Sequence, residues 1–290
     1  MSLCLMRELL DLADKNNRAV GAFNVVNMES VRGIVQAAEE AQTPVILQIA
    51  EKRLAHVPLE LTGPMMMSAA RESSVHIAVH LDHGSSDVVI NKAMSYGFSS
   101  VMFDGSVLSI DENKKRTAVI CKKAAAQSVN VEAELGVVGG SEGGADMQPL
   151  CTDPEEVRFF CKDLPIDALA VAIGNAHGHY NGTPHLNFDI VRQIHAVTDV
   201  PLVLHGGSGI SDEDFRKLID AGIRKINIAT ANMDVMLQCA KHYFEVHGRN
   251  TDFFELTDLL TDAVYKATLH YIRVFNNKES LEIINQTEGG

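Results

Sequence analysis

Eight short runs of aliphatic and β-branched residues alternate with segments of helical periodicity along most of this chain. The intervening segments, such as 28–41 and 211–222, carry apolar residues three and four positions apart and begin with residues that cap helices. Eight strands separated by helices over roughly 250 residues are typical of a (β/α)₈ barrel, whereas a doubly wound sheet usually has about five or six strands. The expected strands are residues 21–25, 45–49, 76–81, 100–103, 130–134, 168–173, 201–204 and 225–228.

Helical patterns also occur at both ends of the chain. Residues 3–12 have apolar positions interrupted by Arg7, Glu8 and Asp11, which predicts an amphipathic helix rather than a signal peptide. Residues 253–275 continue the helical spacing beyond the eighth strand, and we expect them either to pack on the barrel or to form an oligomer arm. The sequence thus predicts one α/β domain, a TIM barrel over residues 1–290, with a C-terminal helical extension at about 250–276.

The composition is that of a soluble protein and disfavours several classes of partner. A hydrophobic fraction of 46% and a charged fraction of 22% are sufficient for a sizeable core. With 25 Lys and Arg against 38 Asp and Glu, the formal charge of −13 argues against nucleic acid and membrane partners. The five cysteines form no CxxC pair, and no stretch approaches a membrane span, so we expect a cytoplasmic protein.

Polar residues follow the expected strands at one end of the barrel. The carboxyl ends of barrel strands carry the active site, and three of them are followed by histidines, namely His83, His177 and His205. One such histidine alone is usually a hydrogen-bonded core or rim residue. Three imidazoles that converge from three strands match the three protein ligands and open position of a catalytic zinc site. His80 is expected to have a structural role.

Two other strand ends resemble anion sites. The segments HGGSGISDED (205–214) and NIATANMD (227–234) place glycines, Ser208 and Thr230 directly before helices. Backbone N–H groups at helix N-termini bind phosphate, and barrels commonly bind phosphate in the loops after strands seven and eight. An ordinary tight turn capped by Ser211 is the alternative reading, and only the place in the barrel favours a phosphate site.

Seven ordered blocks of the sequence resemble one enzyme family over nearly the whole chain. These blocks are GAFNV (21–25), HLDHG (80–84), SVMFDGS (100–106), VEAELG (131–136), AIGNAHGHY (172–180), PLVLHGGSG (201–209) and KINIAT (225–230). They resemble the class II, metal-dependent ketose-bisphosphate aldolases of the fructose- and tagatose-bisphosphate type. The resemblance implies reversible cleavage of a ketose 1-phosphate or 1,6-bisphosphate to dihydroxyacetone phosphate and an aldehyde, through a zinc-stabilised enediolate.

The resemblance also implies roles for single residues. Asp82 would exchange the proton of the aldehyde-derived hydroxyl, Glu142 would move the proton on the substrate carbon, and Asn227 would contact the enediolate. The zinc ligands would be His83, His177 and His205, with Asp104 and Glu134 as positions for a second metal. The substrate and its phosphate would contact Asn24, Gln48, Gly178, Gly206, Gly207, Ser208, Asn227, Ile228, Ala229 and Thr230, near a monovalent Na⁺ or K⁺ ion. Relatives also commonly form homodimers or higher homo-oligomers.

Several alternatives remain. Ala50 stands where many relatives have a small hydroxyl residue, so the substrate is either a bisphosphate or a sugar phosphate without the second phosphate. A Schiff-base aldolase would need a lysine at the catalytic end, where Lys52 is a candidate, while Lys225 is expected at the opposite end of its strand. A non-catalytic barrel that serves as a partner subunit is the third alternative, against which the retained Asp82 and histidines argue.

Overall fold

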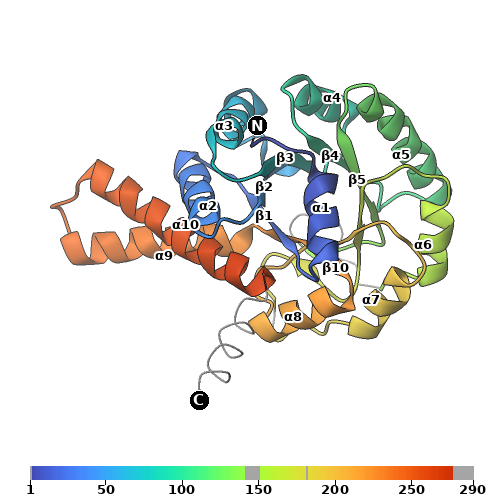
Figure 1. Cartoon of the computed structure of the whole chain (residues 1–290). Helices are drawn as coiled ribbons and strands as arrows, with labels where there is room; N and C mark the ends of the chain where they lie inside the picture. Colours follow the sequence, from blue (N-terminus) through green and yellow to red (C-terminus); the bar gives the residue numbers. More distant parts are fainter. Residues whose placement is uncertain (1, 141–150, 181, 277–290) are drawn as a thin grey trace, which may run out of the picture.

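The computed structural model describes residues 2–140, 151–180 and 182–276, and eight parallel strands within them close into a barrel (Figure 1). Around the barrel the strands follow the order β1, β10, β9, β7, β5, β4, β3, β2. The predicted (β/α)₈ architecture is therefore confirmed. The barrel strands are β1 Val20–Asn24, β2 Val45–Ala50, β3 Ile77–Asp82, β4 Ser100–Phe103, β5 Asn130–Leu135, β7 Ala168–Val171, β9 Leu202–Leu204 and β10 Ile223–Ile228.

Helices connect the strands and surround the barrel (Figure 1). Most begin at a side-chain cap, as where Ser211 accepts a hydrogen bond from the Asp214 N–H at the start of α8. A 3₁₀ turn at Glu51–Arg53 follows β2. The helices are α1 Met6–Lys15, α2 Met28–Glu40, α3 Leu59–Glu72, α4 Asp87–Ser95, α5 Ile110–Ala125, α6 Pro154–Cys161, α7 Phe188–His195, α8 Asp212–Ala221, α9 Thr230–His247 and α10 Phe253–Phe275.

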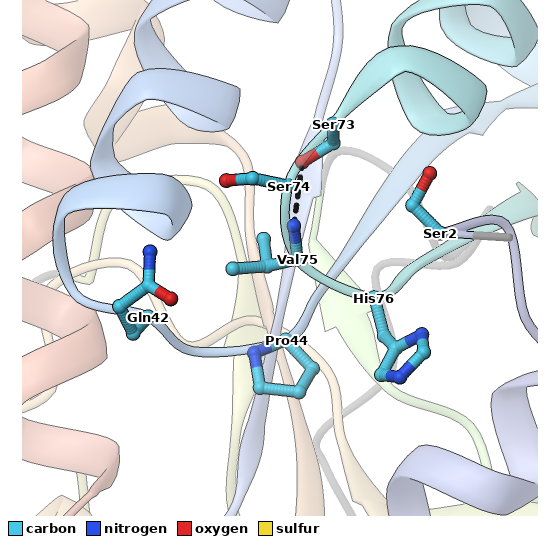
Figure 2. A pocket seen from close by; sticks show the side chains of 7 residues that line it. All are labelled: Ser2, Gln42, Pro44, Ser73, Ser74, Val75 and His76. Carbon is cyan, nitrogen blue, oxygen red and sulfur yellow. Dashed lines mark hydrogen bonds between the residues drawn. The ribbon is translucent and has the colours of Figure 1, made fainter.

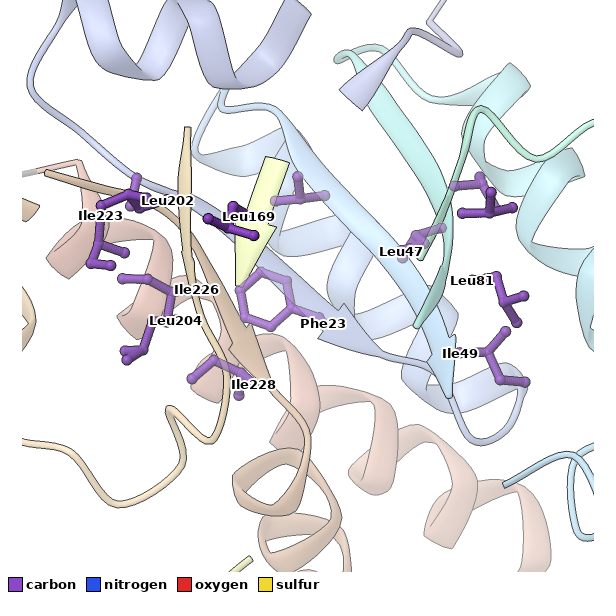
Figure 3. Packing of buried hydrophobic residues seen from close by; sticks show 14 of the residues in the cluster. Phe23, Leu47, Ile49, Leu81, Leu169, Leu202, Leu204, Ile223, Ile226 and Ile228 are labelled. Atoms are coloured by element: carbon purple, nitrogen blue, oxygen red, sulfur yellow. The ribbon is translucent and has the colours of Figure 1, made fainter. Parts of the chain in front are cut away.

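The outer face of the barrel holds the main hydrophobic core. Successive side chains on a strand point to opposite faces, so every second residue meets the surrounding helices. Figure 3 shows this layer, in which β1 contributes Phe23, β2 contributes Leu47 and Ile49, and β10 contributes Ile226 and Ile228. All of these side chains are fully buried. The core thus fixes the strands from outside and leaves the inner face for other residues.

The inner face changes character along the barrel axis. At the amino end, small apolar residues such as Ala22, Ala78 and Ala170 meet Leu9 and Leu10 of α1 in a second apolar cluster. Helix α1 therefore closes this end of the barrel, as its amphipathic sequence allows. Above this layer the inward residues become polar, and the site is built from them.

A surface cavity of about 390 Å³ lies at the amino ends of β2 and β3 (Figure 2). Its only hydrogen bond between lining residues in Figure 2 runs from the Val75 N–H to Ser73 Oγ over 3.2 Å. The lining offers no cluster of titratable groups, so this cavity has no chemistry comparable to the opposite end. The lining residues are Ser2, Gln42, Pro44, Ser73, Ser74, Val75 and His76.

The predicted C-terminal extension is a helix, α10, that forms a hairpin with α9 at one side of the barrel (Figure 1). Helix α10 packs against α2, where a Cβ on Gly33 would lie 2.7 Å from the Thr261 carbonyl oxygen. The hairpin also exposes large apolar side chains, among them Leu237, Phe253 and Phe254. Helix α10 thus packs on the barrel, and the oligomer arm stays a prediction.

Two features differ from the sequence expectations. A two-stranded sheet of β6 Gly139–Gly140 and β8 Ala176–His177 was not expected, because two-residue glycine-containing strands give no periodic signal. Strand β10 begins at Ile223 rather than at 225, so Lys225 lies inside the strand and inside the barrel, and its expected place at the strand's outer end was wrong. Glu142 lies outside the described residues. Among those described, no helix is both long and apolar enough to cross a membrane.

Candidate active site

Three histidines from different parts of the chain meet at the carboxyl end of the barrel. His83 follows β3, His177 ends the short strand β8, and His205 follows β9. Their ring centroids lie 4.5 to 5.7 Å apart, and one nitrogen of each lies within 4.8 Å of the others. His83 has a φ of 46°, a backbone region that non-glycine residues rarely adopt. Such strain is typical of functional sites, and here it turns the His83 ring towards the other two.

Two carboxylates, one just after β4 and one on β5, orient two of the three imidazoles. Asp104 Oδ2 lies 2.8 Å from His83 Nδ1, and Glu132 Oε1 lies 2.9 Å from His205 Nε2. A carboxylate accepts the N–H of the nitrogen that it faces, so the lone pairs remain on His83 Nε2 and His205 Nδ1. Glu134 Oε2 lies 3.3 Å from His205 Nδ1. This is the arrangement that fixes imidazole tautomers for metal binding.

Several buried atoms at this point have no hydrogen-bond partner among the described residues. They include His177 Nδ1, His205 Nδ1 and Glu134 Oε2. Buried polar atoms are normally paired, and a group of unpaired ones on imidazoles and a carboxylate fits the ligand set of a divalent cation. His83, Asp104 and Glu134 form a second group of this kind, which shares His83 with the first. The residues therefore provide two overlapping sites for one metal ion, and both sites include His83.

When no metal cation is bound, protons on the imidazoles balance the negative charges of the carboxylates beside them. Burial opposes a charge on His83, but nearby carboxylates, Asp82 foremost, outweigh it and raise the pKa of His83 to about 10. Burial and the charge on His83 also oppose a charge on His205, but the carboxylates of Glu132 and Glu134, beside its two ring nitrogens, raise its pKa to about 9. Burial, followed by the neighbouring imidazoles, lowers the pKa of His177 to about 3. A bound divalent cation would take the place of these protons.

Asp82 lies beside the histidines in a network of amide side chains. Asn227 Nδ2 donates to Asp82 Oδ1 over 3.1 Å, and Gln48 Nε2 and Asn24 Nδ2 lie 3.3 and 3.4 Å from Asp82 Oδ2. Burial opposes the charge of Asp82, but the positive groups around it, His83 foremost, hold its pKa below the usual value. Asp82 is thus a buried, ionised carboxylate that three amide side chains hold in place.

A cavity of about 220 Å³ lies next to this cluster, at the N-terminus of α9. Ser208 Oγ accepts a hydrogen bond from the Ala231 N–H over 3.0 Å, which joins the loop after β9 to the first turn of α9. The N-terminus of a helix carries unpaired N–H groups and partial positive charge, so this cavity suits an anion. Its lining is His179, Tyr180, Gly182, Ser208, Gly209, Thr230, Ala231 and Asp234.

The glycine at position 206 allows the loops of the site to approach closely. Gly206 has a φ of 62°, and a Cβ there would lie 2.1 Å from the Ala176 carbonyl oxygen. The Tyr180 hydroxyl donates to the Gly206 carbonyl over 2.8 Å and accepts from the Ala176 N–H over 3.0 Å. Tyr180 therefore joins the loop that carries His177 to the loop after β9.

The structure gathers most of the residues singled out from the sequence. All of those within the described ranges lie at or just after the carboxyl ends of strands, although the side chain of Ile228 packs in the outer core: Asn24, Gln48, Asp82, His83, Asp104, Glu134, His177, Gly178, His205, Gly206, Gly207, Ser208, Asn227, Ile228, Ala229 and Thr230.

Sequence analysis missed Glu132, Lys225 and Tyr180, which hold site residues in place. Glu132 and Glu134 are two positions apart on β5, so strand alternation puts both on one face and could have indicated Glu132. The same alternation puts Lys225 on one face of β10 with Asn227 and could have indicated it, whereas no comparable signal marks Tyr180.

Comparisons with known proteins agree with this geometry. The family described as "Fructose-bisphosphate aldolase class-II" matches residues 5–280. The chain is 38% identical over 267 residues to 6-phospho-5-dehydro-2-deoxy-D-gluconate aldolase of Bacillus subtilis (strain 168), which covers 91% of each chain. It is 41% identical over 236 residues to fructose-bisphosphate aldolase of Geobacillus stearothermophilus, which covers 80% of this chain and 82% of the relative.

Solved structures give the same result. The crystal structure of the YdjI aldolase from Escherichia coli K12 superposes with a TM-score of 0.84 and 33% sequence identity, covering 94% of this chain and 97% of that one. The family match covers far more than half of the chain, and the relatives align over nearly their whole length. The chain therefore belongs to the class II fructose-bisphosphate aldolase family.

Proposed function

We propose that this protein is a zinc-dependent aldolase that cleaves a ketose 1-phosphate or ketose 1,6-bisphosphate to dihydroxyacetone phosphate and an aldehyde. The observation that carries the proposal is the cluster of His83, His177 and His205, with Asp82 beside it and an anion cavity next to it. An aldol cleavage needs these three elements, because a charge must be stabilised, a proton moved and a phosphate held.

Three imidazoles with space for a further ligand are the donor set of catalytic zinc. A zinc ion bound there would act as a Lewis acid that stabilises the negative charge developing on the substrate's carbonyl oxygen. Asp104 and Glu132 would keep the imidazoles oriented. Asp104 and Glu134, with His83, would provide the second metal position.

Asp82 would take the proton from the substrate hydroxyl as the carbon–carbon bond breaks, and return it in the condensation direction. Its amide neighbours support this role. Asn24, Gln48 and Asn227 all place N–H groups on its two oxygens, so the carboxylate has a fixed orientation. The substrate contacts expected for these amides stay a prediction.

The phosphate of the dihydroxyacetone phosphate half would bind at the N-terminus of α9. Ser208 and Gly209 of the loop after β9 line the cavity together with Thr230 and Ala231 of the first turn of α9, so backbone N–H groups of these two segments would bind the phosphate. Gly178, Gly206, Gly207 and Ser208 would allow the close approach of the backbone to the phosphate. Thr230 and Ser208 line the cavity with hydroxyl groups.

The half of the substrate that becomes the aldehyde belongs to one of two classes, with a second phosphate or without it. The relatives are named for fructose bisphosphate and for 6-phospho-5-dehydro-2-deoxy-D-gluconate, which share a phosphate and differ at the far end. Ala50 lies at the carboxyl end of β2 and pairs with Asp82 on β3, so the aldehyde half of a substrate that reacts at Asp82 would bind near it. A methyl group there offers no hydrogen bond to a second phosphate, which favours a substrate with a single phosphate.

A substrate panel tests the proposal. Cleavage of ketose 1-phosphates, ketose 1,6-bisphosphates and 6-phospho-5-dehydro-2-deoxy-D-gluconate would be measured with added zinc and with a chelator. We expect zinc-dependent release of dihydroxyacetone phosphate from at least one of them. A protein that binds zinc but cleaves none would support the non-catalytic partner subunit instead, and activity that survives the chelator and is trapped by borohydride would support Schiff-base chemistry.

Two expectations stay predictions. Glu142 would exchange the carbon-bound proton of dihydroxyacetone phosphate, so that Glu142→Ala should slow solvent deuterium exchange into that compound while zinc binding is kept. The apolar surface at the tip of the α9–α10 hairpin fits the expected homodimer or higher homo-oligomer. Sedimentation equilibrium would measure the oligomeric state, and a monomer would contradict the expected homo-oligomer.

A further inference from the structure

A buried lysine lies beneath the candidate active site. Lys225 is fully buried on β10, two residues before Asn227, so both side chains point into the barrel. A buried ammonium group is costly unless it is paired with a charge and hydrogen-bonded. Its Nζ lies 2.9 Å from Glu132 Oε2 and donates to Asn227 Oδ1 over 2.7 Å. Lys225 thus has both partners, and each of them contacts a residue of the site.

The contact with Asn227 decides which way the amide group faces. An asparagine amide can turn by 180° and exchange its donor and acceptor ends, whereas an ammonium group only donates. With Lys225 below, the amide must direct Oδ1 downward, and Nδ2 then donates to Asp82 Oδ1 over 3.1 Å. If the amide turned over, its NH₂ group would face the Lys225 ammonium, so that two donors would meet. Its oxygen would face the Asp82 carboxylate, so that two acceptors would meet.

The contact with Glu132 holds the lysine in this place. Glu132 also binds His205 through Oε1, at 2.9 Å from Nε2. Burial opposes the charge of Glu132, but the ammonium of Lys225 outweighs it and keeps the pKa of Glu132 below its usual value. A single fixed cation is therefore connected to a metal-facing imidazole on one side and, through an amide, to the proton-accepting carboxylate on the other.

We propose that Lys225 is a positioning residue that fixes the Asn227 amide so that Nδ2 faces Asp82. This inference rests on the proposed function, because it concerns the group that moves the proton in that reaction. Glu132 and Asn227 both accept hydrogen bonds from the Lys225 ammonium inside the barrel. Lys225 therefore acts as a fixed hydrogen-bond donor rather than as a Schiff-base nucleophile.

The test uses a charge-neutral change, because Lys225→Met alone would leave the Glu132 carboxylate buried without its cation. In Lys225→Met/Glu132→Gln both charges are removed, and the glutamine carbonyl can still accept the N–H of His205. Zinc affinity, measured by chelator competition, shows whether the histidine cluster is intact. We expect it to weaken by no more than the roughly 10- to 100-fold that is typical when a ligating imidazole loses its carboxylate partner, so kcat is measured at saturating zinc.

Activity is then compared in two backgrounds. In the wild-type background the charge-neutral pair should lower kcat by about 10- to 100-fold with little change in KM, because the substrate still binds but Asp82 is misaligned. In an Asn227→Ala background the same pair should change kcat by less than about twofold, because there is no amide left to orient. An equal loss in both backgrounds, or no loss in either, would overturn the proposal.

A readout without turnover separates this inference from the proposed function. In protein labelled with [¹⁵N]asparagine, the side-chain amide of Asn227 is identified by its absence from Asn227→Ala. We expect that resonance to shift and to exchange faster with solvent in Lys225→Met/Glu132→Gln than in the wild type. An unchanged amide resonance would overturn the positioning role even if the protein is an aldolase. A changed resonance in a protein that cleaves no substrate would support the role of Lys225 and reject the proposed function.

Discussion

The two ends of the barrel differ in what their inward side chains contact. At the amino end, Leu9 and Leu10 of α1 pack on alanines and valines of the strands. At the carboxyl end, the same strands direct Glu132, Lys225 and Asp82 inward, where histidines and amides surround them. Apolar burial stabilises the fold, whereas buried charges and unpaired nitrogens are costly unless a ligand completes them. The residues that stabilise the fold and the residues suited to chemistry therefore lie at opposite ends of one set of strands.

The largest effect is expected at the carboxyl end. Asp82→Ala and Asp82→Asn should both lower the rate of cleavage by about 10²- to 10⁴-fold, because neither can accept the hydroxyl proton. Zinc content should stay at the wild-type level, because the three histidines are unchanged. Steady-state kinetics and metal analysis of the purified variants measure the two quantities. Full turnover by either variant would contradict the assignment of Asp82.

The reverse pattern is expected at the amino end. Leu10→Ala should lower the free energy of unfolding by about 2–5 kcal/mol, because it leaves a cavity in the layer beneath α1. Zinc affinity and kcat should stay unchanged at temperatures where the variant is folded. Leu12→Ala, on the same helix but half exposed, is the matched control and should have little effect in urea denaturation. A loss of zinc affinity in Leu10→Ala would show that the two ends are coupled.

A smaller effect is expected at the glycine between the site loops. Gly206→Ala would pay about 1–2 kcal/mol for its left-handed backbone and would also press on the Ala176 carbonyl beside His177. Gly248→Ala is the matched control, with a φ of 60° and no atom near the added Cβ. Both variants should lose stability from backbone strain, Gly206→Ala should lose more through its contact with the Ala176 carbonyl, and only Gly206→Ala should raise KM and weaken zinc binding. Equal KM values for the two variants would contradict the close approach.

The smallest effect concerns acid pH. Burial, followed by the charge of Lys225, lowers the pKa of His80 to about 3. The unfolded chain takes up a proton at this residue below about pH 6.5, whereas the folded protein does not until about pH 3, so stability falls as the pH drops through this window. Between pH 7 and 5.5, the free energy of unfolding of His80→Gln should therefore fall by about 1 kcal/mol less than that of the wild type.

Urea denaturation at several pH values measures this difference, with the exposed His56→Gln as control. If His80→Gln and the wild type lost the same stability across the window, His80 would not be held neutral inside the barrel.

The sequence predicted the barrel and the residues at strand ends more fully than their partners. Because parallel strands bring all of their carboxyl ends to one side, His83 and His205 could be expected to meet from their positions alone. Glu132 and Lys225 lie within strands on different sides of the barrel, and only the closed structure shows that they touch. The β6–β8 pair that places His177 depends on glycines with no periodic pattern, so it could not be predicted.

Zinc titration of the metal-free protein tests the central claim most directly, namely that three imidazoles at the carboxyl end hold the cation of an aldolase. The account predicts one tightly bound zinc ion per chain at the three-histidine site. His205→Ala should weaken that binding by about 100-fold or more, while His80→Gln should leave it near the wild-type value. A wild-type protein that binds no zinc at micromolar concentrations, or a His205→Ala variant that binds it equally well, would contradict the account.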